Sequence, residues 1–165
     1  MLDNSIINPY IRVAMQSILR KGTKIARRII FDYELIYVAN GEFILNYNET
    51  DYKCAKGQFI LLRPGISHSF SVTDTDLSQP HIHFDITHIS NSKQVPVCFK
   101  DLNALGDEER KHIREDIFRK YPKTPFVVFS AYFQPRQKRE SYERFIEIPT
   151  SQDRTPQCGR VYKLH

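Results

Sequence analysis

Four ionisable residues in the first half of the chain could bind a metal ion or a small polar molecule. Glu34 lies in the apolar run "YELIY", His68 follows the turn residues of "RPGISH", and His81 and His83 stand two apart in "PHIHFDI". Imidazole and carboxylate groups coordinate transition-metal ions, and they also orient small ligands by hydrogen bonds. Each of them can equally be a buried side chain whose hydrogen bonds are satisfied.

The spacing of these residues indicates which side chains share a face. In an extended strand alternate residues point the same way, so His68 points with Phe70 and Val72. A buried imidazole among apolar neighbours needs a hydrogen-bond partner, and we expect Glu34, His81 or His83 to supply it. Glu34 itself shares a face with apolar residues. It must therefore meet Arg27, Arg28 or a histidine, unless that face is a wet pocket.

The strongest contrast lies around His81 and His83, which share a face with Gln79 and Asp85. The opposite face is apolar and carries Ile82, Phe84 and Ile86. If the apolar side fills a core, the polar row is the solvent side of a half-buried strand. If the polar side faces a barrel interior, it lines a ligand pocket. Periodicity alone does not decide between the two.

The elements that position these residues are short alternating runs between Ile11 and Thr87, separated by turn residues. No helical periodicity interrupts them, so a β-sandwich or a small barrel is expected. Asn40-Gly41 lies between "LIYVA" and "EFILNY", and such a pair predicts a two-residue type I′ hairpin.

The pattern changes after Asp101. The stretch "DEERKHIREDIFRKYP" predicts one helix with acidic residues in its first turn, and Ile113, Ile117 and Tyr121 form an apolar face for the sheet or a partner. "PFVVFSAYF" is expected to be a strand. The last residues, 151–165, are polar and are expected to be poorly ordered.

Composition narrows the class of protein. A chain of 165 residues fits one domain, and the net charge of +5 is not concentrated in either half, which argues against direct nucleic-acid binding. The three cysteines, Cys54, Cys98 and Cys158, lack CxxC spacing, so reduced thiols are expected. Asp3 and Asn4 interrupt the apolar core that a signal peptide would need, and no apolar run approaches the length of a membrane span, so we expect neither. We therefore expect a cytoplasmic protein without a membrane partner.

The segment "DYELIYVANGEFILNYNETDYKCAKGQFILLRPGISHSF", followed by "HIHFDI", resembles the amino-terminal cupin domain of AraC-type transcription regulators. The resemblance implies a mainly β fold, a cupin-type double-stranded β-helix (jelly-roll barrel), with a carboxy-terminal helical extension. It divides the chain into an arm (1–10), the barrel (11–100), a helical dimerisation extension (101–150) and a tail (151–165). It also implies a small-molecule effector, often a sugar, and a homodimer. In that family a separate helix-turn-helix half binds DNA, and we expect this chain to lack it.

The resemblance places effector-binding residues in the barrel, with an arm around Asn8 that closes over the ligand. The expected ligand-binding residues are Glu34, Ile36, His68, Phe70, Gln79, His81, His83, Pro9 and Tyr10. The expected dimer interface consists of Ile113, Ile117 and Tyr121.

Cupin enzymes resemble the same scaffold but hold a metal with a His-x-His pair, a Glu and a later His. Glu34 and His68 match two of these ligands, whereas "RRIIF" stands where the pair would be. We therefore expect no catalytic residue, no metal and no cofactor. The alternative is a metal-dependent cupin enzyme that uses His68, His81 and His83. A third hypothesis is a dimerisation module whose barrel is filled and dry.

Overall fold

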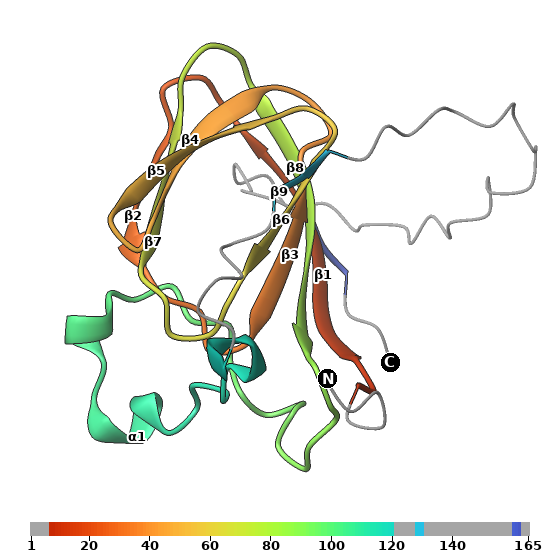
Figure 1. The fold of residues 1–165 in the computed structure, drawn as a ribbon, viewed down its shortest axis with the longest axis vertical. Coiled ribbons are helices and arrows are strands. Elements are labelled where there is room, and N and C mark those ends of the chain that lie inside the picture. Colours follow the sequence, from red (N-terminus) through yellow and green to blue (C-terminus); the bar gives the residue numbers. More distant parts are fainter. Residues whose placement is uncertain (1–6, 121–127, 131–159, 163–165) are drawn as a thin grey trace, which may run out of the picture.

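Two antiparallel sheets face each other and enclose the core (Figure 1). This computed structural model describes residues 7–120, 128–130 and 160–162. The first sheet has the order β10-β1-β8-β3-β6-β9, and the second has the order β2-β7-β4-β5. The strands are β1 (Tyr10–Leu19), β2 (Lys24–Arg28), β3 (Tyr33–Tyr37), β4 (Glu42–Tyr47), β5 (Thr50–Ala55), β6 (Gln58–Leu62), β7 (His68–Val72), β8 (Leu77–Asp85), β9 (Val128–Ser130) and β10 (Arg160–Tyr162).

The first eight strands pair in a nested order. β1 pairs with β8, β2 with β7, β3 with β6 and β4 with β5, all antiparallel. These eight strands thus form one long hairpin wound into two sheets, and among them every connection except β4–β5 crosses from one sheet to the other. This is the jelly-roll winding of a cupin barrel, so the predicted fold class is confirmed.

The hairpin predicted at Asn40-Gly41 is wrong. β3 and β4 lie in different sheets, and Asn40 instead bridges to Ser78. Gly41 has φ +81°, and a Cβ there would lie 2.4 Å from the carbonyl oxygen of Asp76, so glycine is needed where the chain changes sheets. The two-residue turn with two positive φ angles, 48° and 66°, is Asn48-Glu49 at the tip of the wound hairpin.

The core between the sheets follows from strict alternation along the strands. In β4 every second residue is buried, and its neighbour β7 and the strand β6 of the other sheet show the same alternation. The buried apolar cluster consists of Leu19, Ile30, Ile36, Val38, Phe43, Leu45, Tyr47, Cys54, Ile60, Leu62, Phe70, Val72 and Leu77. Burial of large side chains such as Phe43 and Leu45 stabilises the barrel by about 1.5–3 kcal/mol each.

The predicted long helix after Asp101 does not form. In its place are a helical turn, α1 (Asp107–Arg110), and a 3₁₀ turn, η3 (Ile117–Lys120), at one end of the barrel; a further 3₁₀ turn, η2 (Leu102–Ala104), precedes them (Figure 1). Between α1 and η3 the backbone N–H of Arg114 donates to the carbonyl of Phe31 at 2.7 Å. Such tertiary hydrogen bonds outweigh the weak helical preference of a short segment.

The predicted interface residues therefore do not share one helical face. Ile113 packs against a second cluster of its own chain, formed by Ile29, Phe31, Val95, Cys98 and Leu105. Ile117 donates its backbone N–H to the Tyr33 hydroxyl at 2.9 Å. Tyr121 lies outside the described residues.

The carboxy-terminal part of the chain contributes two short strands. The strand expected in "PFVVFSAYF" is present as β9, which pairs with β6, and its other residues lie outside the described ones. β10 pairs with β1 and lies in the expected tail. Cys54 and Cys98 are free and buried, while Cys158 is not among the described residues. In the described part of the chain, no helix has the length and apolar character needed to cross a membrane.

Candidate functional site

The polar row of β8 faces the inside of the barrel. Gln79, His81, His83 and Asp85 are all buried, whereas the intervening residues of the strand are partly exposed. Of the two alternatives that periodicity leaves open, the interior location is therefore confirmed. Buried polar groups are costly unless they find partners, so the contacts of this row decide its role.

The register of β3 against β8 brings Glu34 to the histidines. Glu34 lies opposite His83, and Ile36 lies opposite His81. Directly opposed and diagonal residues share a face, so the carboxylate lies beside both imidazoles. Glu34 Oε1 is 3.8 Å from His81 Nε2 and 4.0 Å from His83 Nε2. Both distances are too long for hydrogen bonds.

Both imidazoles are oriented through their other nitrogen. His83 Nδ1 lies 3.0 Å from Asp32 Oδ1, and His81 Nδ1 lies 3.1 Å from the carbonyl oxygen of Gln79. A carboxylate and a carbonyl only accept, so each Nδ1 carries a hydrogen and donates it. Each Nε2 is thereby directed toward Glu34.

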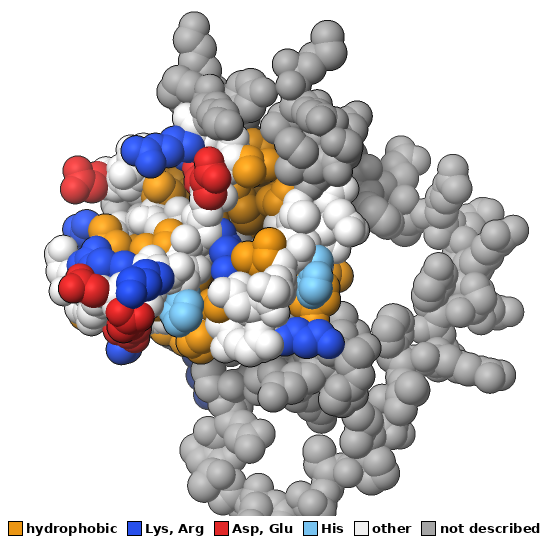
Figure 2. Space-filling view, turned by 90° about the horizontal axis from the view of Figure 1, so that it is seen from below, with side chains coloured by type: hydrophobic (Ala, Val, Ile, Leu, Met, Phe, Trp, Pro, Cys, Tyr) orange, Lys and Arg blue, Asp and Glu red, His pale blue; other side chains and the backbone are white. Residues whose placement is uncertain are grey.

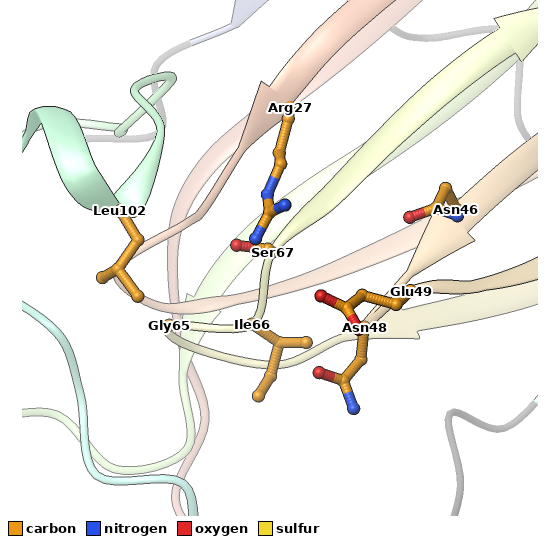
Figure 3. Close-up of a pocket in the computed structure, with 8 residues that line it drawn as sticks. All are labelled: Arg27, Asn46, Asn48, Glu49, Gly65, Ile66, Ser67 and Leu102. Atoms are coloured by element: carbon orange, nitrogen blue, oxygen red, sulfur yellow. The ribbon is translucent and has the colours of Figure 1, made fainter.

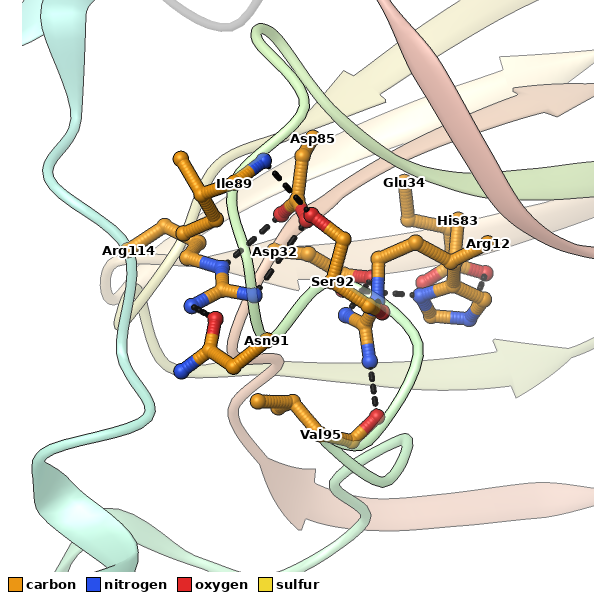
Figure 4. A network of polar contacts seen from close by, with 10 residues as sticks. All are labelled: Arg12, Asp32, Glu34, His83, Asp85, Ile89, Asn91, Ser92, Val95 and Arg114. Carbon is orange, nitrogen blue, oxygen red and sulfur yellow. Dashed lines mark hydrogen bonds and ion pairs between the residues drawn. The ribbon is translucent and has the colours of Figure 1, made fainter.

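Asp32 is held from its other side by Arg12. The Arg12 guanidinium forms an ion pair with Asp32 and donates to the carbonyl oxygens of Ser92 and Val95 (Figure 4). Both side chains are nearly inaccessible to solvent. The chain of contacts from Arg12 through Asp32 and His83 to Glu34 links β1, β3 and β8 into one buried polar network.

The charges of this network shift pKa values in opposite directions. Burial alone would raise the pKa of Glu34, but the neighbouring His83 and His81, together with Arg28, lower it below its ordinary value. Burial alone would lower the pKa of His83, whereas Glu34 and Asp32 together raise it. The site thus favours an ionised carboxylate with positive charge next to it.

Several polar atoms of the interior have no hydrogen-bond partner. They include Glu34 Oε2, Gln79 Oε1 and His83 Nε2. An unsatisfied buried polar atom costs about 1–3 kcal/mol. Their concentration in one place marks a candidate binding site, because a bound group would supply the missing partners.

His68 belongs to the same interior but not to the Glu34 cluster. Its Nδ1 donates to the carbonyl oxygen of Ile66 at 3.1 Å, and its Nε2 accepts from Arg28 Nε at 3.3 Å. The expected hydrogen bond to Glu34, His81 or His83 is therefore wrong, because β7 lies in the other sheet and Arg28 is its neighbour in register. Burial lowers the pKa of His68 to about 4.

The alternative metal set of His68, His81 and His83 is not the one that the structure assembles. Within the described residues, the grouped metal-binding atoms belong to Glu34, His81 and His83, and all lie within 4.8 Å of one another. His68 is excluded because both of its ring nitrogens already have protein partners.

The apolar residues expected at the site form its walls. Ile36 and Phe70 are almost completely buried, and the Phe70 ring packs 5.0 Å from Phe43 and 5.7 Å from His68, centre to centre. The Arg28 guanidinium lies 5.5 Å from the centre of the Phe70 ring, within range of a cation–π interaction.

The amino-terminal arm runs beside the end of β8. Asn8 donates its backbone N–H to Ile86 at 3.0 Å, and the Tyr10 ring lies 4.7 Å from that of His88. Pro9 is exposed. These contacts hold the arm at the strand end, with Tyr10 directed to an exposed histidine rather than to the Glu34 cluster.

The surface pockets are separate from the interior cluster. One, of about 210 Å³, is lined by Arg27, the β4–β5 turn, the loop before β7 and Leu102 (Figure 3). A second, of about 260 Å³, lies where the extension crosses the end of β8. None of the nine expected ligand-binding residues lines either pocket. The end of the barrel seen in Figure 2 carries acidic and basic side chains side by side.

The extension is attached to the polar row through Asp85. Arg114 donates to Asp85 Oδ1 at 2.9 Å and to Oδ2 at 3.2 Å, and it also contacts Asn91 (Figure 4). A bidentate pair of this kind fixes the geometry of both partners.

Asp32 and Arg12 also belong to the site, although the sequence did not predict them. Asp32 precedes Glu34 by two positions, so two-residue alternation could have placed them on one face. Arg12 has no such local signal, because it meets Asp32 only through the pairing of β1, β8 and β3.

Comparisons with known proteins extend these observations. A family model described as the AraC-like ligand binding domain matches residues 22–137. The uncharacterized HTH-type transcriptional regulator YisR of Bacillus subtilis (strain 168) is 32% identical over 78 residues, which are 47% of this chain and 27% of that protein. The chain thus spans about a quarter of the length of the curated relative that it matches.

Among solved structures, similar chains include a predicted oxalate decarboxylase from Thermotoga maritima and fatty-acid-bound ToxT from Vibrio cholerae strain SCE256. The first has a TM-score of 0.42 and 23% identity, and the match covers 46% of this chain and 67% of that one. The second has a TM-score of 0.37 and 16% identity, with 44% and 28% covered.

Proposed function

Because this chain belongs to the AraC-like ligand-binding domain family, we propose that its barrel binds a small polar effector and signals this to the DNA-binding part of a transcription regulator. The observation that carries the proposal is the buried polar row of β8, with the amide oxygen of Gln79 left without a hydrogen-bond partner. A ligand hydroxyl or amine would satisfy it. In an otherwise apolar interior, such groups are what orient a bound molecule.

A sugar-like effector fits the chemistry of this interior. Gln79 offers an acceptor for a hydroxyl group, and the Phe70 ring offers an apolar face for a sugar ring. The Arg28–His68 pair supplies further polar contact from the opposite sheet. Because these side chains are largely buried, the effector enters only when one end of the barrel opens.

Three further features belong to the proposal. The domain binds its effector without transforming it, DNA is contacted by a helix-turn-helix domain rather than by this barrel, and the protein is a homodimer. The net charge of +5 is not concentrated in either half of the chain, which favours DNA contact by another domain, because nucleic-acid binders gather positive charge on one face. Light scattering tests whether the protein is a homodimer, and a monomer at all concentrations would contradict this part of the proposal.

Thermal denaturation with a panel of pentoses and hexoses tests the effector site. A sugar that binds only the folded state stabilises it by about 2.7 kcal/mol at a hundred times its Kd, so the Tm should rise with concentration. In Gln79→Leu this rise should disappear. Gln16→Leu, on the exposed side of β1, should respond like the unmodified chain. The proposal would be contradicted if no sugar of the panel raised the Tm, or if the Tm of Gln79→Leu rose as much as that of the unmodified chain.

A further inference from the structure

We propose that Glu34, His81 and His83 form a site for one divalent first-row transition-metal ion. The inference goes beyond effector binding and does not depend on it, because all three metal-binding residues belong to β3 and β8 of this chain. It also differs from the usual cupin arrangement. There the His-x-His pair would lie in the segment "RRIIF", whereas here both imidazoles belong to β8.

The spacing of the three donor atoms fits a single ion. A metal–nitrogen bond is about 2.0–2.1 Å and a metal–carboxylate bond about 2.0–2.2 Å. Two donors on one ion therefore cannot be more than about 4.2 Å apart. Glu34 Oε1 lies 3.8 Å from His81 Nε2 and 4.0 Å from His83 Nε2, which is inside this limit. All three donor atoms lie within 4.8 Å of one another, so the two imidazoles need to approach each other by at most about 0.6 Å to bind the same ion. The same distances leave the three atoms without hydrogen bonds to one another.

The orientation of the imidazoles is the one that metal-binding histidines adopt. His83 donates its Nδ1 hydrogen to Asp32, and His81 donates its own to the carbonyl of Gln79. Partners of this kind fix the ring and leave the Nε2 lone pair for the ion. Arg12 holds Asp32 in place, so the orientation of His83 is supported by a second buried contact.

Two polar atoms of the site lack the protein partners that buried groups ordinarily have. His83 Nε2 and Glu34 Oε2 are buried and have no hydrogen-bond partner. The Glu34 side chain is only 1% exposed, so its charge is held away from bulk solvent. A cation between the carboxylate and the imidazoles would satisfy the nitrogens and balance the buried negative charge.

The donor set selects the kind of metal. Two imidazoles and one carboxylate suit Zn²⁺, Fe²⁺, Co²⁺ or Ni²⁺, whereas Mg²⁺ and Ca²⁺ prefer oxygen ligands only. Three protein ligands leave at least one coordination position open. Water or an oxygen atom of a bound small molecule can occupy that position.

Titration of the chelator-treated 165-residue chain with Co²⁺ tests the proposal directly. Ligand-field absorption in the visible range reports coordination, and we expect saturation at one equivalent. Zn²⁺ should displace Co²⁺, whereas a large excess of Mg²⁺ should not. Absence of saturable Co²⁺ binding by the folded chain would overturn the proposal.

Two conservative variants locate the ion. Glu34→Gln and His83→Gln each remove one ligand atom. The Co²⁺ affinity should fall by more than about a hundredfold in each variant, because loss of a residue that only hydrogen-bonds to a metal ligand already lowers metal affinity by about 10–100-fold. His88→Gln removes an exposed imidazole and should bind Co²⁺ as the unmodified chain does. Equal affinity in Glu34→Gln and the unmodified chain would contradict the site. If His83→Gln does not fold, Glu34→Gln alone decides.

Discussion

Glu34 and His83 are directly opposed residues of the β3–β8 pair, so their side chains leave the sheet on the same face and meet inside the barrel. Backbone pairing alone thus brings a carboxylate and an imidazole together in a place where solvent is almost excluded. Asp32, on the other side of His83, fixes the ring by a 3.0 Å hydrogen bond. The interior of this barrel therefore holds a buried polar cluster beside its apolar core.

His68 should make the protein less stable in acid. Its pKa is about 4 in the folded chain and about 6.5 when unfolded, so the unfolded chain takes up the proton first as the pH falls. The contribution of neutral His68 is complete above about pH 6.5 and is lost toward pH 4, with a total of about 3 kcal/mol. The charged groups around it are Arg28, Glu34 and His83.

Urea denaturation between pH 4 and pH 7 in the presence of a chelator measures this contribution. The free energy of unfolding should fall less steeply with acidification in His68→Gln than in the unmodified chain. His88→Gln, which removes an exposed histidine, should keep the original slope. The same slope in all three proteins would show that His68 does not titrate as the structure indicates.

Gly41→Ala should destabilise the crossing between the sheets. The residue has φ +81°, and the new Cβ would lie 2.4 Å from the backbone oxygen of Asp76. We expect the free energy of unfolding to fall by at least about 2 kcal/mol. Gly22→Ala is a matched control, because Gly22 has a similar φ of +82° with nothing within 4 Å, and should cost only about 1 kcal/mol. Equal losses would refute a role for the Asp76 contact.

Glu49→Gly should stabilise the tip of the wound hairpin. Glu49 has φ +66°, a conformation that costs a non-glycine residue about 1–2 kcal/mol. Glycine removes this strain and completes an Asn-Gly pair at the β4–β5 turn. We expect the free energy of unfolding to rise by about 1 kcal/mol in chemical denaturation. A decrease would mean that the turn is held by contacts of the Glu49 side chain.

Arg114→Ala should detach the extension from the end of β8. The guanidinium binds both carboxylate oxygens of Asp85, and both side chains are mostly buried. Its removal leaves a buried carboxylate unpaired, which costs about 3 kcal/mol. Lys111→Ala breaks only an exposed pair with Glu108 and should change stability by less than about 1 kcal/mol. Thermal denaturation compares the two, and similar small losses in both would argue against an attachment by Arg114.

Much of the barrel and its site could be predicted from local patterns. Two-residue alternation placed the strands, assigned His81 and His83 to one face and put Glu34 on an apolar strand, because the pleat of a strand depends only on its own residues. Those patterns are short-range, and the residues that carry them stand next to one another in the sequence.

The tertiary structure decided which strands meet. Asn40-Gly41 has the residue types of a two-residue hairpin turn, yet β3 and β4 lie in different sheets of the barrel. The predicted helix ends at Arg110, and Arg114 beyond it bonds to Phe31 and Asp85. The partner of His68 is likewise set by the pairing of β2 with β7. Contacts between residues far apart in the sequence leave no periodicity in either segment, and only the assembled sheets determine them.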